Sequence, residues 1–273
     1  MTMPVISIIG AGNMGRSLIS GLIKNHHLPH HLIASNPTRE KLHDLEEVFH
    51  IHTTTNNLEA AEKSDVIIFA TKPQILLRVA KELASSIQKR KPLVISVAVG
   101  ISEKEICKSL GGYRTIIRAM PNISVLIGDG ATALYANKEV NEEKRHLAES
   151  ILRSVGLVVW LDQESQMDVV TALSGCGPAY FFLVMEALQK AAEEFGLAYE
   201  TAHLLTLQTA LGAARLAMES KQSLQELRQK VTSPGGSTEK ALAVLEKNNI
   251  CDIFKQALYA AKERACELAK TAL

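Results

Sequence analysis

Short, uninterrupted apolar runs alternate with amphipathic helical patterns through the first part of the chain. The helical patterns cover residues 14–24, 39–49 and 141–156. The apolar runs are of strand length and occupy residues 5–9, 31–36, 65–70, 93–98, 114–120, 132–136 and 157–161. Runs without polar alternation, separated by helices, are typical of parallel strands that are covered on both faces. The pattern therefore predicts an α/β fold with a doubly wound parallel sheet of the Rossmann type.

The pattern changes near residue 163, after which only helical patterns follow. They cover residues 177–197, 198–220, 223–231, 237–249 and 251–272. Several are rich in Ala and apolar on more than one face, and a helix that is apolar all round must be buried. A partner subunit can bury it, so we expect a homodimer or a larger homo-oligomer. The predicted domains are a sheet domain, 1–162, and an all-helical domain, 163–273.

Composition excludes several classes of partner. The chain has 273 residues, of which 47% are hydrophobic, 22% charged and 4% aromatic, with a formal net charge of +1. Neither a basic surface for nucleic acid nor aromatic stacking platforms are expected. The N-terminus lacks a leader pattern, and the most apolar run, near "PAYFFLVM", is shorter than the roughly 20 residues that cross a bilayer, so no membrane partner is expected.

The cysteines indicate the cellular compartment, and the histidines bear on whether the chain binds a metal. The four cysteines, at 107, 176, 251 and 266, are widely separated, which fits reduced thiols in the cytoplasm. The stretch "HHLPHH" at 26–31 is interpreted as a polar loop with Pro29 at a turn, because no cysteine or carboxylate cluster accompanies it. No metal is expected.

The stretch "GAGNMG" follows the first strand and opens the first helix. Gly10 permits a tight turn, Gly12 lets a pyrophosphate approach the backbone, and Gly15 lets helix and strand pack closely. The helix N-terminus adds free N–H groups and a positive dipole. The candidate dinucleotide-binding residues are Gly10, Ala11, Gly12, Asn13, Met14 and Gly15.

The end of the second strand carries no carboxylate. NAD sites usually hold the ribose 2′-OH with an Asp or Glu there, whereas this chain has "ASNPTR" at 34–39. Amide and hydroxyl groups with a nearby Arg suit a 2′-phosphate, which favours NADPH, although hydrogen bonds from Asn36 leave NADH possible. "ATKP" at 70–73 follows a third strand; it either lines the nicotinamide side or simply starts a helix with Pro73 in its first turn.

The stretch "TSPGGSTEKAL" at 232–242 interrupts the helical half. Gly and Pro are poor helix formers, so the break implies a compensating role. Gly235 and Gly236 can expose backbone N–H groups, the next helix adds its positive end, and Ser233, Ser237 and Thr238 add hydroxyls. The group suits a carboxylate, although a Ser or Thr that only caps the helix is the alternative.

The same stretch resembles the signature of the pyrroline-5-carboxylate reductases. "IIGAGNMG", "ATKP", "IRAMPN" and "TALSGCGPAYFF" occur in the same order, so the resemblance covers essentially the whole chain. It implies NAD(P)H-dependent reduction of 1-pyrroline-5-carboxylate to L-proline, the last step of proline biosynthesis, with hydride transfer to the imine carbon. It also implies dimers of interleaved helical domains, in which residues 163–273 bind substrate and dimerise.

The resemblance also implies roles for single residues. The substrate carboxylate would rest on the amides of Gly235, Gly236 and Ser237, and Thr238 would reach the ring nitrogen or the carboxylate. Glu164 and Thr171 match positions near the ring nitrogen, and with Thr238 they form the expected catalytic set. Expected cofactor contacts are Asn36, Asn57, Thr71, Lys72, Pro73 and Ala98. The proton donor stays open.

Three positions depart from the family pattern, and two other functions compete. After Met-Pro-Asn at 120–122, Ile123-Ser124-Val125 stands where Thr-Pro is more usual. Cys176 stands where Ser is common and is expected to be a buried, inert thiol, and Ser237 is a mild change. A hydroxyacid dehydrogenase of the 6-phosphogluconate type would need a Lys base, for which Lys190 and Lys240 are available. An idle NADPH-sensing module would need only the glycine-rich turn.

Overall fold

The computed structural model describes residues 3–271 of the chain. It contains two compact units. The first comprises the chain up to Cys176 together with the chain from Ala261 onward, and the second comprises Gly177–Ala260. Each unit is described by itself below.

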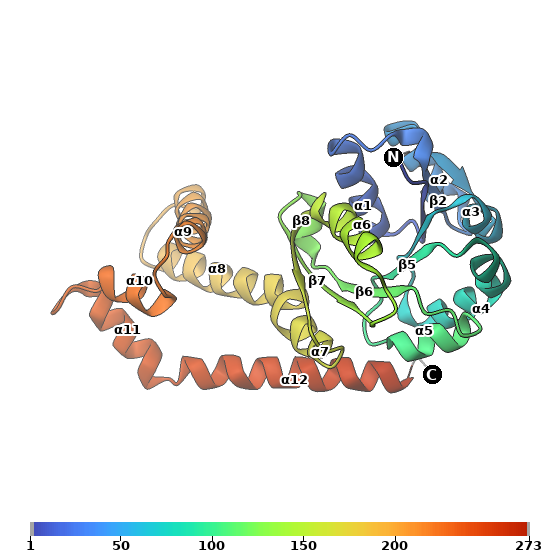
Figure 1. Cartoon of the computed structure of the whole chain (residues 1–273). Coiled ribbons are helices and arrows are strands. Elements are labelled where there is room, and N and C mark those ends of the chain that lie inside the picture. Colours follow the sequence, from blue (N-terminus) through green and yellow to red (C-terminus); the bar gives the residue numbers. More distant parts are fainter. Residues whose placement is uncertain (1–2, 272–273) are drawn as a thin grey trace. The chain divides into compact units, whose positions relative to one another are not determined.

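The first unit is built on a single eight-stranded sheet in the order β3-β2-β1-β4-β5-β6-β7-β8. All the strands of the predicted pattern are present, and Figure 1 shows helices on both sides of them. Their bounds are β1 (Ile6–Ile9), β2 (Leu32–Ser35), β3 (His52–Thr54), β4 (Val66–Phe69), β5 (Leu93–Ser96), β6 (Ile116–Met120), β7 (Gly130–Ala136) and β8 (Gly156–Trp160). The strand that the pattern missed is β3, whose sequence His-Thr-Thr offers no apolar run.

Two separate hydrophobic clusters cover the two faces of the sheet. One contains Leu18, Leu42 and Ile151 from α1 (Asn13–Lys24), α2 (Arg39–Phe49) and α6 (Glu142–Arg153). The other contains Leu83 and Ile106 from α4 (Pro73–Arg90) and α5 (Glu103–Ser109), with alanines of α3 (Asn57–Lys63). Helices on both faces explain why the central strands are apolar without alternation. The doubly wound fold class is therefore confirmed.

The sheet is not parallel throughout, which corrects one detail of the prediction. Strands β1 to β6 pair in parallel, whereas β6 pairs antiparallel with β7, and β8 runs parallel to β7. A parallel return needs a crossover of a dozen or more residues. The β6–β7 connection contains only the 3₁₀ turn η2 (Ile123–Leu126), so the chain returns in the opposite direction. The departure at 123–125 forms this turn, and Val125 is buried.

The first unit extends beyond the predicted boundary after residue 162. The short helix α7 (Gln166–Val170) and the π-helical turn η3 (Thr171–Gly175) cluster with the sheet. Met167 and Ala172 are buried there, and α7 packs against β7. The end of α12 also belongs to this unit: Ala265 is buried, and the Cys266 thiol donates a hydrogen bond to Asp168 Oδ2 at 3.3 Å.

The second unit is all helical, as the pattern predicts. It contains α8 (Gly177–Glu194), α9 (Tyr199–Glu219), α10 (Leu224–Lys230), α11 (Ser237–Lys247) and the start of α12 (Ile250–Thr271). Local signals set the ends: Gly196 follows α8 with φ +98°, and Ser223 and Glu226 form a capping box on α10. Many of its apolar side chains are exposed, with Phe182 at 62% and Phe195 at 88%.

One stretch corrects the expectation that every apolar run is too short to cross a bilayer. By length and composition alone, Gln166–Glu194 could span a membrane, with a mean hydropathy of 1.4 in its most apolar window. Only 22% of that window is buried within the chain. A helix that buries its apolar surface against a second subunit has the same composition.

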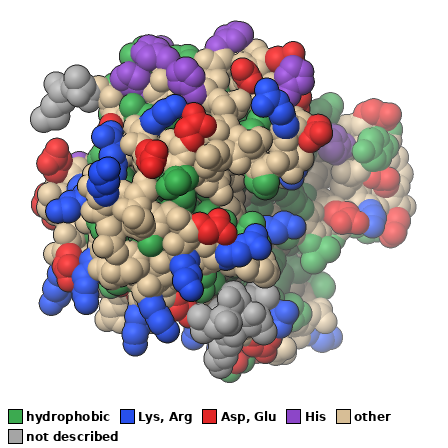
Figure 2. Space-filling view, turned by 90° about the vertical axis from the view of Figure 1, so that its right-hand side faces the viewer, with side chains coloured by type: hydrophobic (Ala, Val, Ile, Leu, Met, Phe, Trp, Pro, Cys, Tyr) green, Lys and Arg blue, Asp and Glu red, His purple; other side chains and the backbone are tan. Residues whose placement is uncertain are grey.

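The histidine-rich stretch forms a loop that ends in the 3₁₀ turn η1 (Pro29–His31). The ring centroids of His30 and His31 are 4.6 Å apart, and those of His27 and His31 are 6.4 Å apart. Within residues 3–271, no group of three or more His, Cys, Asp or Glu side chains is placed to hold a metal. Figure 2 shows acidic and basic side chains intermixed on one face of the first unit, with histidines gathered at one edge of that face.

Candidate active site

Four strand ends meet at one edge of the sheet. Ile9, Phe69 and Ser96 lie opposite one another in the parallel register of β1, β4 and β5, and Ser35 of β2 lies opposite Ile9. The loops that follow these strands begin at the same edge. The structure therefore brings together the predicted cofactor residues Gly10, Asn36, Thr71 and Ala98, at the carboxyl edge where open α/β sheets bind ligands.

The three glycines of "GAGNMG" have three different surroundings. Gly10 has φ +115°, and a Cβ there would lie 2.6 Å from the carbonyl oxygen of Ala70. A Cβ on Gly15 would lie 2.2 Å from the carbonyl oxygen of Gly10, so the close helix–strand approach needs glycine. A Cβ on Gly12 would meet no atom within 4 Å. Gly10 and Gly15 thus serve the fold, whereas Gly12 faces open space.

The start of α1 has the features of a phosphate site. Gly12 is its N-cap, no side chain caps it, and its first turn carries no acidic residue. The first backbone N–H groups of a helix have no partner within the helix. The buried Thr71 hydroxyl in the adjoining loop also has no hydrogen-bond partner in the described chain. An open glycine, an uncapped helix start and an orphaned hydroxyl fit a dinucleotide.

Asn36 and Asn57 are held at the end of β2. Asn36 Oδ1 accepts a hydrogen bond from the Ala11 N–H at 3.3 Å, and its Nδ2 donates to the Thr38 carbonyl at 3.2 Å. The Ser35 hydroxyl donates to Asn57 Oδ1 at 2.6 Å. The amides are therefore oriented by local contacts, and β2 itself ends without a carboxylate, as expected for an NADP-type site.

The two interpretations of "ATKP" are compatible. Lys72 is the N-cap of α4 and Pro73 its first residue, which is the helix-start reading. The two preceding residues of the motif, Ala70 and Thr71, lie against Gly10 at the carboxyl edge. Ala98, on the loop after β5, is buried, and its N–H donates to the Ser96 hydroxyl at 3.4 Å.

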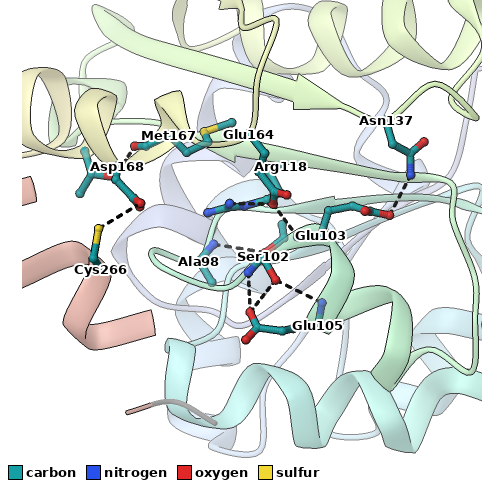
Figure 3. A network of polar contacts seen from close by, with 12 residues as sticks. Ala98, Ser102, Glu103, Glu105, Arg118, Asn137, Glu164, Met167, Asp168 and Cys266 are labelled. Atoms are coloured by element: carbon teal, nitrogen blue, oxygen red, sulfur yellow. Dashed lines mark hydrogen bonds and ion pairs between the residues drawn. The ribbon is translucent and has the colours of Figure 1, made fainter. Parts of the chain in front are cut away.

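Glu164 lies in a network of polar contacts that the sequence did not reveal (Figure 3). Its Oε1 accepts hydrogen bonds from Arg118 Nη1 at 2.8 Å and from the Glu103 N–H at 2.6 Å. Glu103 Oε1 in turn accepts from Asn137 Nδ2 at 2.8 Å. Burial, together with the nearby charges of Glu164 and Glu103, raises the pKa of Tyr135, which lies opposite Arg118 in the sheet.

Thr171 stands at the start of the π-helical turn. Its hydroxyl donates to the Met167 carbonyl at 2.9 Å, which leaves the oxygen free only as an acceptor. The Cys176 N–H donates to the Thr171 carbonyl, the i to i−5 bond of a π-helix. Gly175 closes the turn against Met120, since a Cβ there would lie 2.5 Å from Met120 Cε. Cys176 is partly exposed, which corrects the expectation of a buried thiol.

The Pro-Gly-Gly loop lies in the second unit. Gly235 has φ +73°, and the Gly236 N–H donates to the Ser233 carbonyl at 3.0 Å. Gly236 is the N-cap of α11, and no side chain caps it, so no Ser or Thr serves as the cap. Ser237 and Thr238 are the first residues of α11, and in the described chain their amide N–H groups have no acceptor. Of the three amides expected to be bare, only that of Ser237 lacks an acceptor in the described chain, because those of Gly235 and Gly236 donate to groups within the loop; the bare pair is Ser237 with Thr238.

Sequence reasoning missed one member of this loop. The Gly235 N–H donates to Glu239 Oε2 at 2.9 Å. A Glu three residues after an N-cap is half of a capping box, and this spacing from Gly236 pointed to Glu239, although its carboxylate accepts from Gly235, the residue before the N-cap. Gly235 is thus engaged within the loop, and its contact with Glu239 fixes the turn that presents the next amides.

Comparison with known proteins decides the family. The chain is 43% identical over 270 residues to a pyrroline-5-carboxylate reductase of Pseudomonas aeruginosa, which covers 99% of this chain and 98% of that protein. The chain belongs to the pyrroline-5-carboxylate reductase family. The family model for pyrroline-5-carboxylate reductase dimerisation matches residues 164–268, and a model for NADP oxidoreductase, coenzyme F420-dependent, matches residues 5–100.

Solved structures agree with this family. A pyrroline-5-carboxylate reductase from Coxiella burnetii is 48% identical, with a TM-score of 0.93 over 98% of this chain and 99% of that one. The Plasmodium falciparum pyrroline carboxylate reductase with NADP bound is 30% identical, with a TM-score of 0.88 over 98% and 99%. The chain is therefore an oxidoreductase of proline biosynthesis, and its family reduces 1-pyrroline-5-carboxylate to L-proline with NAD(P)H.

The hydroxyacid dehydrogenase alternative loses its support. It required a positioned lysine base, whereas Lys190 is ion-paired with Glu186 at 2.6 Å on an exposed face of α8. Membership of an enzyme family also favours an enzyme over a non-catalytic NADPH-sensing module. Which residues of this chain carry the reaction is a separate question.

Proposed function

We propose that this chain binds NADPH at the carboxyl edge of its sheet and the carboxylate of 1-pyrroline-5-carboxylate at the start of α11. The observation that carries the proposal is the uncapped start of α11, where the amides of Ser237 and Thr238 have no acceptor among the described residues. The positive end of a helix favours an anion there. Ser233, Gly235, Gly236 and the Thr238 hydroxyl complete the proposed substrate-binding set.

The proposed cofactor contacts are the residues that the sheet brings to one edge. Residues 10–15 would hold the pyrophosphate, and Asn36 and Asn57 the adenosine ribose. Thr71, Lys72, Pro73 and Ala98 would line the side toward the nicotinamide. NADPH is favoured because β2 ends in Ser35 and Asn36 with Arg39 nearby, where an NAD site usually carries a carboxylate.

In this reaction the main task of the chain is to orient the substrate, and proton transfer is secondary. When bound, the reduced nicotinamide supplies the hydride, and a protonated imine is already electrophilic. The chain then has to hold the ring at hydride-transfer distance and exclude water. Glu164, Thr171 and Thr238 are the proposed groups near the ring nitrogen. Thr171 can only accept a further hydrogen bond while its hydroxyl donates to Met167, so it would receive the imine N–H.

The proposed assembly is a homodimer or a larger homo-oligomer that functions in the cytoplasm. Support comes from the exposed apolar side chains of α8 and α9 and from the dimerisation model over residues 164–268. The same match supports a functional division near residue 163, although the chain folds into units that divide at residue 176. The four free cysteines fit a reducing compartment.

The deciding experiment measures NADPH oxidation with and without 1-pyrroline-5-carboxylate. We expect turnover only with the substrate, and a loss on the order of a hundredfold in kcat/KM for Thr238→Ala, as for other hydrogen-bond deletions at reacting centres. Thr232→Ala is the matched control, because the Thr232 hydroxyl donates to the Arg228 carbonyl of the preceding helix α10. Equal activity of the two variants would remove Thr238 from the site.

A further inference from the structure

Arg118 is a charged residue in the middle of a buried strand. It lies in β6 opposite Ser96 of β5, and Ser96 aligns with Phe69 and Ile9, the residues from which the cofactor loops depart. Although Arg118 is in the middle of β6, its side chain leaves the sheet level with the ends of β1, β4 and β5, which form the carboxyl edge. Arg118 is only 8% exposed. A buried charge is costly unless it is paired, so the position needs a specific reason.

The pair is made with Glu164, and it joins three separate segments. The side chains of Arg118 and Glu164 are 10% and 27% exposed, and their closest atoms are 2.8 Å apart. The same carboxylate oxygen accepts the Glu103 N–H at 2.6 Å. One oxygen atom therefore ties together β6, the start of α5 and the segment that leads into α7, as Figure 3 shows.

The loop between Ser96 and Glu103 is fixed at both ends by these contacts. At its start, the Ser96 hydroxyl accepts the Ala98 N–H. At its end, the Glu103 N–H is held by Glu164, and Ser102 and Glu105 form the capping box that begins α5. Ala98 is the proposed nicotinamide-side contact on this loop. The position of that contact thus depends on a carboxylate that Arg118 holds in place.

We propose that Arg118 is a positioning residue for hydride transfer. Through Glu164 it fixes the loop 97–102 and the carboxylate itself beside the nicotinamide. This inference rests on the proposed function, which places the nicotinamide at Ala98. Charge-assisted hydrogen bonds of this kind are short and directional, so the guanidinium specifies a geometry as well as a charge.

The test compares Arg118→Met, Arg118→Lys and the control Arg114→Met in the full-length protein. Arg114 precedes the same strand and is ion-paired with Glu139 at 3.0 Å, but both of those side chains are more than half exposed. Steady-state kinetics would be run with NADPH and with NADPH dideuterated at C4 of the nicotinamide. The unfolding temperature of each variant would be measured in parallel.

We expect Arg118→Met to lower kcat by 10- to 100-fold, on the order of the cost of a misplaced reacting group. Its KM for NADPH should stay within about twofold, because the phosphate contacts are remote, and the deuterium isotope effect on kcat should rise as hydride transfer becomes rate-limiting. Arg118→Lys should recover part of kcat, since it keeps the charge, and Arg114→Met should match the parent.

Two results would overturn the inference. One is an Arg118→Met enzyme with parental kcat. The other is a loss of kcat that matches the fraction of unfolded protein while the isotope effect stays unchanged. A parent enzyme that fails to oxidise NADPH with 1-pyrroline-5-carboxylate would instead refute the proposed function, so the two failures are distinguishable.

Discussion

The two units differ in how much of their apolar surface they bury within the chain. In the first unit, Ile8, Ile68 and Phe69 are completely buried, and two hydrophobic clusters close both faces of the sheet. In the described part of the second unit, the only buried hydrophobic residue is Ala202, while Phe181, Phe182 and Leu204 are more than 60% exposed. One unit is complete as a folded core, and the other is not.

This difference explains how the second unit can be rich in apolar residues yet have no core of its own. Helices that are apolar all round are stable only when a second surface covers them. The candidate substrate loop belongs to the same unit, so in the proposed oligomer its geometry depends on helices that another subunit covers. The cofactor edge belongs to the unit that is already closed.

The largest expected effect is on assembly. Phe182→Asp should convert the oligomer into monomers at micromolar concentration, because each subunit loses the burial of an aromatic side chain and would have to bury a carboxylate. Light scattering would measure the mass, and thermal unfolding would show a lower and less concentration-dependent midpoint. Lys190→Ala on the same helix removes an exposed ion pair and should change neither. An unchanged oligomer would show that the exposed face of α8 is not the interface.

A change in the closed unit should separate cofactor binding from assembly. Gly12→Val should weaken NADPH binding by roughly a hundredfold, about 2.7 kcal/mol, because its side chain fills the open space above the helix start. The fold should survive, since nothing lies within 4 Å of the added Cβ. Fluorescence titration with NADPH measures the effect. Gly15→Ala is the contrast: its Cβ would meet the Gly10 carbonyl, so it should destabilise the unit itself.

A smaller effect is expected in the substrate loop. Glu239→Ala removes the acceptor of the Gly235 N–H, a hydrogen bond worth about 1 kcal/mol, so KM for 1-pyrroline-5-carboxylate should rise about fivefold. KM for NADPH should not change. Glu239→Gln keeps an acceptor oxygen and should stay near the parent. A rise in KM for NADPH alone would contradict the assignment of this loop to the substrate.

The smallest effect concerns pH and the first unit. Burial, and then the neighbouring His31, lower the pKa of His27 below its ordinary value of about 6.5. The unfolded chain therefore takes up a proton more readily, and the stability that neutral His27 contributes is lost as pH falls through 6.5 toward the folded pKa. Urea unfolding at pH 7.5 and 5.5 should show a smaller drop for His27→Gln than for the parent. His43→Gln, at an exposed position, is the control.

Much of the fold could be predicted, because the spacing of apolar residues along the sequence reflects which faces of each element are buried by its neighbours. The strands around Ile8, Ile68 and Ile95 are apolar throughout, since helices cover both faces, and "GAGNMG" identified the first turn through steric needs that only glycine meets. The strand β3 escaped detection because three polar residues at an edge leave no apolar signal. The reversal of β7 depends on the short connection before it, which composition does not reveal.

The site was less predictable because its contacts join residues that are distant in sequence. Glu164 by itself reads as a solvated carboxylate, and only the fold brings Arg118 and Glu103 to it. A charge inside "TIIRAM" was the available hint of a buried partner. Glu239, by contrast, is a local contact, and its spacing from Gly236 could have been recognised. Sequence patterns thus identify local turns well and tertiary ion pairs poorly.

The return of α12 to the first unit has a consequence for the order of folding during synthesis. Residues 163–176 of that unit remain without part of their packing until the last segment of the chain, with Ala265 and Cys266, leaves the ribosome. A nascent chain that already carries every strand of the sheet therefore still exposes the α7 surface. The first unit can complete its packing only after the second unit, Gly177–Ala260, has been synthesised. The folding of the two units is therefore coupled in time.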